Sequence, residues 1–223
     1  MWTDHGGCAN GSSHTVNTNN PHSGVYSLEI EYIMPVGAGG SRDVNCGVRI
    51  DLDPLTEVYF SGYVYFKYPE LGPDSTEVQR KMIEVGDAAP GSAQWSYVLD
   101  CWTGAQGSPT PNALWLNQVR QTNGHGSPVD YELFSMSWDT WYNVEVHLIQ
   151  NTVNGGTGNA DGTAEVWVNG SNVYSNNALY INGDSTAQII DYAYGRQLNE
   201  YVGQEMDEFR YWDDIKITDY QVS

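Results

Sequence analysis

The chain has 223 residues, with 28 acidic against nine basic side chains and a formal net charge of −19. This charge argues against nucleic acid and anionic membrane surfaces as general partners, because both require a basic surface. Since 40% of the residues are hydrophobic and only 17% are charged, the chain has enough apolar surface to fold. The 16 Tyr and eight Trp against four Phe favour surfaces that are half exposed to water.

The sequence carries few signs of targeting. No run of about 18 apolar residues exists, so we expect no membrane insertion. The first residues lack the basic and apolar regions of a signal peptide. Low Lys and high Asn, Gly, Ser and Thr content favours an extracellular or virion-associated protein.

The three cysteines, Cys8, Cys46 and Cys101, allow at most one disulfide. The pairing stays open, and buried thiols are the alternative to a bridge. No two cysteines lie at the sequence spacing of a zinc site, so we expect no structural zinc.

Alternation of apolar and polar residues dominates and predicts β-strands. In residues 58–67, Phe60, Val64 and Phe66 are predicted to face the core, while Tyr63 and Tyr65 face the other way. Turn-forming Gly, Pro, Asn and Asp clusters separate the strands. The predicted strands cover residues 25–32, 44–52, 58–67, 95–102, 113–121, 141–149, 163–169, 188–194 and 208–218.

Two segments are special. Residues 74–85 fit a short helix, although residues 81–85 fit a strand equally well, and residues 154–162 form a long loop that ends in an Asp-Gly hairpin signal. Many strands, short connections and no linker predict one all-β domain, a β-sandwich that spans residues 1–223.

Several motifs resemble one superfamily. Residues 137–148 (SWDTWYNVEVHL) and 161–170 (DGTAEVWVNG) are similar to paired strands of concanavalin A-like jelly rolls. Residues 21–28 (PHSGVYSL) resemble their opening strand, and residues 211–217 (YWDDIKI) their closing strand. These motifs occur in the expected order, so the resemblance implies a β-jelly roll of two packed antiparallel sheets.

A finer resemblance points to the polysaccharide lyases of this superfamily, of the alginate and glucuronan lyase type. A Tyr-rich strand at residues 58–67 precedes a segment that carries Lys81, although the flanking Gly and Pro of the lyase pattern are missing. The resemblance implies binding and β-elimination of a polysaccharide that contains uronic acid.

β-Elimination requires a group that neutralises the uronate carboxylate, a base that removes the C5 proton, and an acid that protonates the leaving oxygen. The alternation places several polar side chains on those faces of their strands that point away from the core. If these faces line one concave sheet, the side chains form a single groove. The candidate catalytic residues are His147, Arg120, Gln118, Lys81, Tyr63 and Tyr192. The candidate substrate-binding residues are Tyr65, Trp167, Asn143, Glu145, Tyr194 and Arg196.

Other interpretations remain open for these residues. His147 fits a hydrogen-bonded surface residue, Arg120 fits an ion pair, and the tyrosines fit cross-strand pairs. The paired-Glu spacing of glycosidases does not occur in the chain. Whether the protein is an enzyme therefore stays open, and the alternative is a non-catalytic carbohydrate-binding or extracellular or viral structural module.

The resemblance also implies a structural calcium ion between the opening and closing strands. Asp213 matches the carboxylate ligand, and Gly24 matches the carbonyl ligand. Solvated aspartates ahead of a strand are the alternative.

Overall fold

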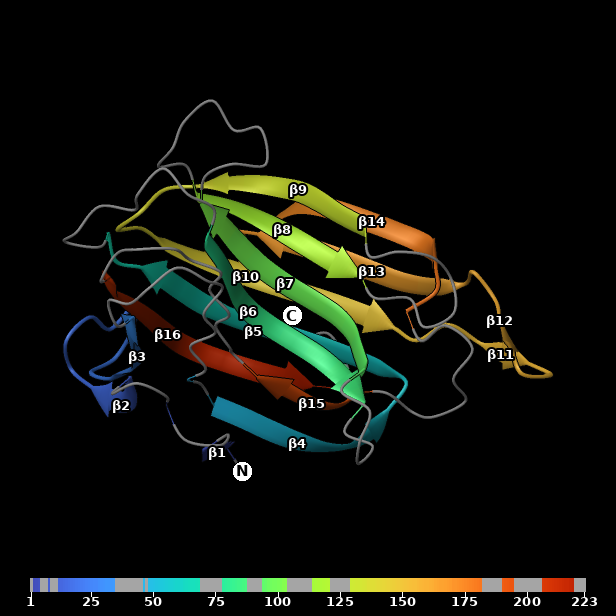
Figure 1. Cartoon of the computed structure of the whole chain (residues 1–223), viewed down its shortest axis with the longest axis horizontal. Coiled ribbons are helices and arrows are strands. Elements are labelled where there is room, and N and C mark those ends of the chain that lie inside the picture. Colours follow the sequence, from blue (N-terminus) through green and yellow to red (C-terminus); the bar gives the residue numbers. More distant parts are fainter. Residues whose placement is uncertain are drawn as a thin grey trace.

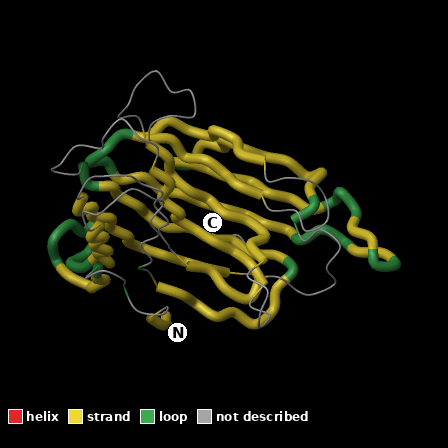
Figure 2. Tube along the Cα trace, in the orientation of Figure 1, coloured by secondary structure: helices red, strands yellow, loops and turns green. Residues whose placement is uncertain are grey.

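The structure is a computed structural model that describes residues 2–4, 8, 12–34, 46, 48–68, 78–87, 94–103, 114–120, 129–181, 190–194 and 206–218. Side chains are described at residues 8, 12–32, 46, 55–68, 82–83, 99, 101, 116, 132–181 and 209–218. The described residues form strands and loops only (Figure 2). Accordingly, no helix among them is long and apolar enough to cross a membrane.

Two seven-stranded antiparallel sheets pack against each other (Figure 1). Sheet I has the order β1 (Trp2–Asp4), β4 (Val48–Leu55), β15 (Ile190–Tyr194), β6 (Val78–Asp87), β7 (Gln94–Thr103), β8 (Leu114–Arg120) and β9 (Val129–Met136). Sheet II has the order β14 (Ser171–Leu179), β13 (Gly162–Val168), β10 (Trp141–Ile149), β5 (Glu57–Phe66), β16 (Met206–Thr218), β3 (Ser27–Met34) and β2 (Ser13–Asn17).

The core lies between the sheets, and the strand periodicity produces it. Phe60, Val64 and Phe66 of β5 are buried, whereas the odd-numbered residues of that strand are half-buried on the outer face. Leu99 of β7 and Leu116 of β8 supply fully buried side chains from sheet I to the same cluster. The predicted inward and outward phases of residues 58–67 are therefore confirmed.

The β16 strand adds a charged group to the core. The Arg210 side chain is fully buried, with its guanidinium 5.0 Å from the Tyr32 ring centroid and 4.8 Å from that of Phe66. Such cation–π contacts stabilise a cation that has left water. This residue carried no signal in the sequence pattern.

A tight turn closes one small hairpin. The short strands β11 (Val153–Asn154) and β12 (Thr157–Gly158) pair through Gly155 and Gly156, whose φ angles are 61° and 84°. Glycine adopts such positive φ angles without a Cβ clash. The loop predicted at residues 154–162 therefore contains a small hairpin of its own.

Several elements differ from the sequence expectations. The ambiguous segment at residues 74–85 contributes to strand β6, and the strands that alternation did not reveal are β1, β2, β9, β11, β12 and β14. The strand predicted at residues 25–32 begins two residues later, at Ser27, so that Tyr26 lies outside β3 and is 60% exposed.

Two of the three cysteines form a disulfide, and the third remains a thiol. Cys8 and Cys46 form a disulfide. The thiol of Cys101 is fully buried in the core, where its sulfur lies 3.0 Å from the sulfur of Met82. Both alternatives from the sequence thus occur in one chain.

Gly162, the first residue of β13, allows a close backbone approach. A Cβ at this position would lie 2.9 Å from the Leu179 carbonyl oxygen, 3.0 Å from the Asn151 nitrogen and 3.1 Å from the Ile149 carbonyl oxygen. Because all three are backbone atoms, none can rotate away. We expect Gly162→Ala to lower the free energy of unfolding by about 2 kcal/mol, as overpacking does elsewhere. Urea denaturation measures this change.

Gly62, in the middle of β5, is the matched control. A Cβ there would meet its nearest neighbour, the Ile215 side chain, at an ordinary contact distance of 3.5 Å. Gly62→Ala should change the free energy of unfolding by less than about 1 kcal/mol. Equal destabilisation by the two alanines would contradict the packing argument.

Candidate functional site

The predicted site residues fall on both sheets. His147, Asn143 and Glu145 of β10, Tyr63 and Tyr65 of β5, and Trp167 of β13 belong to sheet II. Lys81 of β6, Gln118 and Arg120 of β8, and Tyr192 and Tyr194 of β15 belong to sheet I. Arg196 lies outside the described residues. The structure therefore does not bring the two sets into one groove, since the core separates the outer faces.

His147 lies on the outer side of sheet II, where its neighbours hold it tightly. Its Nδ1 lies 2.9 Å from a carboxylate oxygen of Glu165, and its Nε2 lies 2.8 Å from one of Glu57. The imidazole stacks on the Tyr59 ring at a centroid distance of 3.9 Å, and only 6% of the residue is exposed. With both ring nitrogens engaged, His147 links three strands and presents no open nitrogen to a substrate.

The tyrosines of this face are engaged as well. Tyr63 stacks on the His22 ring at a centroid distance of 3.6 Å. The Tyr65 hydroxyl donates to Asp139 at 3.1 Å. Burial raises the pKa of Tyr65, and the Asp139 carboxylate raises that pKa further. The Tyr65 phenol therefore stays protonated near neutral pH and acts as a donor.

A shallow pocket opens between β5, β10, β13 and β16. Most of its volume is open to solvent, and the part that the protein encloses is small. Trp167 and Tyr59 provide aromatic walls, and Glu145 and Lys216 provide a carboxylate and an ammonium group. Aromatic rings beside polar groups are the side-chain types that contact sugar rings.

The outer face of sheet II is acidic. Among the described side chains on β3, β5, β10, β13 and β16 there are seven carboxylates and one lysine, Lys216. Such a surface repels an anionic polymer. The carboxylates belong to Glu29, Glu31, Glu57, Glu145, Glu165, Asp213 and Asp214.

Asp213, the predicted calcium ligand, organises a turn. One of its oxygens accepts the backbone N–H groups of His22 and Ser23, each at 2.9 Å, and the other accepts that of Asp214 at 2.8 Å. Gly24 follows in this turn with a φ of 63°. A calcium ion at Asp213 would have to share these oxygens, and its binding remains a prediction.

The outer face of sheet I is defined by register. Residues opposite each other on antiparallel strands share a face, and residues along a strand alternate between faces. Lys81 pairs with Asp100, which lies between the buried Leu99 and Cys101. The register therefore assigns Lys81 to the outer face of sheet I.

Both β15 tyrosines share that face by the same reasoning. Tyr194 pairs with Glu84 of β6, and Glu84 pairs with Val98, the neighbour of buried Leu99. Tyr192 is two residues earlier on the same strand. On its other side Tyr194 pairs with Arg49 of β4, a cation that the sequence pattern did not single out.

Gln118 and Arg120, the two candidates on β8, are assigned to the opposite face of sheet I from Lys81. Gln118 pairs with buried Leu99, and it stands two residues after buried Leu116. Arg120 follows in the same phase. The register therefore separates Gln118 and Arg120 from Lys81.

Solved structures share this architecture, although no family model and none of the curated proteins matches the chain. An endo-β-1,4-glucuronan lyase from the fungus Trichoderma reesei superposes with a TM-score of 0.69 at 13% identity, covering 97% of this chain and 94% of that one. The alginate lyase Aly36B, in complex with an alginate tetrasaccharide, gives 0.61 at 16% identity over 89% and 84%. The chain has the fold of the jelly-roll polysaccharide lyases. The predicted fold class is thereby confirmed.

A third structure with the lyase fold has a name that mentions no enzymatic activity. Cellulose induced protein Cip1 superposes with a TM-score of 0.57 at 18% identity, over 99% of this chain and 92% of that one. Because one fold hosts several functions, the function of this chain depends on its own residues.

Proposed function

We propose that the chain binds a uronic-acid-containing polysaccharide on the outer face of sheet I and cleaves it by β-elimination. The observation that carries this proposal is the register, which assigns Lys81, Tyr192, Tyr194 and Arg49 to one face. Two structures of the same fold are named as lyases of glucuronan and alginate, which are both polyuronates.

The proposed roles follow from the chemistry of the residue types. Lys81 or Arg49 pairs with the uronate carboxylate and thereby acidifies the C5 proton. One of the two β15 tyrosines removes this proton, and the other protonates the leaving oxygen. The same register assigns Asp100 and Glu84 to this face, so Lys81 and Arg49 have to supply the local positive charge that an anionic polymer needs.

The test is an assay of the full chain on alginate, on glucuronan and on a neutral polymer such as cellulose. β-Elimination creates a double bond conjugated with the carboxylate, which absorbs in the ultraviolet. We expect this absorbance to rise with at least one polyuronate and to stay flat with the neutral polymer. A flat trace with every polyuronate contradicts the lyase proposal.

A second candidate is a non-catalytic carbohydrate-binding module that uses the sheet II pocket. Trp167 and Tyr59 beside Glu145 favour it, because aromatic faces stack on sugar rings while polar groups bond their hydroxyls. Retention on a glycan without any unsaturated product, lost in Trp167→Ala, would support this alternative.

We further propose that the protein works outside the cell or on a virion. The Cys8–Cys46 disulfide supports this location, because such bridges persist in oxidising environments.

A further inference from the structure

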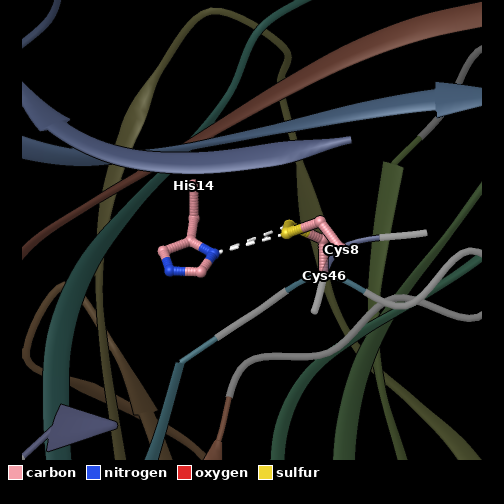
Figure 3. Close-up of side chains that lie close together, drawn as sticks. All are labelled: Cys8, His14 and Cys46. Carbon is pink, nitrogen blue, oxygen red and sulfur yellow. Dashed lines mark hydrogen bonds between the residues drawn. A yellow bond between two sulfur atoms is a disulfide. The ribbon is translucent and has the colours of Figure 1, made fainter. Parts of the chain in front are cut away.

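The segment before β2, strand β2 itself and the segment before β4 place three metal-ligating residue types together. Figure 3 shows the Cys8–Cys46 disulfide beside the His14 imidazole. The His14 Nδ1 atom lies 3.3 Å from the Cys8 Sγ atom and 3.9 Å from the Cys46 Sγ atom. These three ligand atoms all lie within 4.8 Å of one another, and the described part of the chain holds no other such group.

The distances from nitrogen to sulfur match a tetrahedral metal centre. Zinc bonds of about 2.3 Å to sulfur and about 2.0–2.1 Å to nitrogen place a nitrogen about 3.6 Å from each sulfur. The two observed distances lie on either side of this value. Only the two sulfurs, joined in the disulfide, need to separate, to about 3.8 Å in a zinc centre.

The surroundings hold the site in place. Cys46 is only 3% exposed, and its carbonyl oxygen accepts a hydrogen bond from the Tyr32 hydroxyl at 3.2 Å. Tyr32 is a fully buried residue of β3, which pairs with the β2 strand that carries His14. Cys46 and His14 are thus both tied to the sheet II core.

We propose that Cys8, His14 and Cys46 form a redox-gated zinc site. A dithiol reductant supplies two electrons and two protons, which convert the disulfide to two thiols, and the reductant becomes a disulfide. Zn²⁺ then binds the two thiolates and the His14 Nδ1, releasing the two thiol protons, and water fills the fourth position. The same three residues tie the N-terminal segment to the sandwich in both states, by a covalent bond when oxidised and by a metal when reduced.

The experiment uses the full chain and Co²⁺ as a spectroscopic substitute for Zn²⁺. Counted in denaturant, because Cys101 is buried in the folded chain, the oxidised protein should show one thiol, that of Cys101, and the reduced protein three. Under anaerobic conditions the reduced protein should develop thiolate-to-cobalt charge-transfer bands at one Co²⁺ per chain, and added Zn²⁺ should remove them. The oxidised protein should develop none.

Two variants locate the site. His14→Gln leaves both cysteines in place and should weaken binding by more than about tenfold, because even outer partners of a metal ligand contribute that much. Cys101→Ser removes the core thiol and should bind as the unmodified chain does. The proposal is overturned if the reduced chain gives no charge-transfer bands, if His14→Gln binds with unchanged affinity, or if Cys101→Ser abolishes binding.

Discussion

Lys81→Ala should lower kcat/KM on a responsive polyuronate by about 100- to 1000-fold, if the proposed lyase activity is present. The substitution removes the cation that the register assigns to the outer face of sheet I. A preorganised charge aimed at the reacting group contributes an effect of this size. Initial rates of ultraviolet absorbance, measured over a range of polymer concentrations, give the comparison.

Lys67→Ala is the matched control for this experiment. Lys67 is the same residue type next to the other sheet, where its ammonium group lies 5.0 Å from the Phe209 ring centroid. Its loss removes the same charge from the chain and should leave kcat/KM within about twofold, because distant surface charges are screened by salt. Unchanged turnover in Lys81→Ala, or an equal loss in both variants, would remove the sheet I site.

His147→Ala should lower the free energy of unfolding by about 3 kcal/mol. It deletes contacts of 2.8 and 2.9 Å to Glu57 and Glu165 together with the stack on Tyr59. It also leaves the partly exposed Glu57 and Glu165 carboxylates without the imidazole between them, although water offsets part of this loss, so most of the effect comes from the emptied buried site. Urea denaturation at neutral pH measures the change.

Two further variants separate the causes of that loss. Glu145→Ala, on the same strand and face, should change stability by no more than about 0.5 kcal/mol. Adding Glu57→Gln to His147→Ala should restore part of the lost stability, because it relieves the carboxylate repulsion. If His147→Ala instead folds normally and loses turnover by about 100-fold, then His147 is a catalytic residue after all.

Much of the fold could be predicted from the sequence, because the alternation of apolar and polar residues indicates which face of a strand is buried. The sequence interpretation of residues 141–149 matches β10 in both bounds. β6 remained ambiguous for a physical reason. Its pairing with β7 shifts between Lys81 and Ile83, so that Met82 and Ile83 are both buried, and consecutive apolar residues obscure a period of two.

The candidate site was harder to predict from the sequence, because the alternation does not indicate which sheet a strand joins. The phase of His147 was predicted correctly, yet β10 and the β8 strand of Arg120 belong to different sheets. Strand order depends on contacts between distant parts of the chain. The carboxylates that engage His147 illustrate this, since Glu57 precedes it by 90 residues.

The β11–β12 hairpin is a suitable position for attaching a label or an affinity tag. It extends beyond the end of the sandwich in Figure 1, and a Cβ added at Gly155 or Gly156 in its turn would meet no atom within 4 Å. A fluorophore or affinity peptide inserted between these glycines should therefore leave both outer faces accessible. The protein could then be immobilised through this hairpin, so that polymer binding is measured without blocking either sheet.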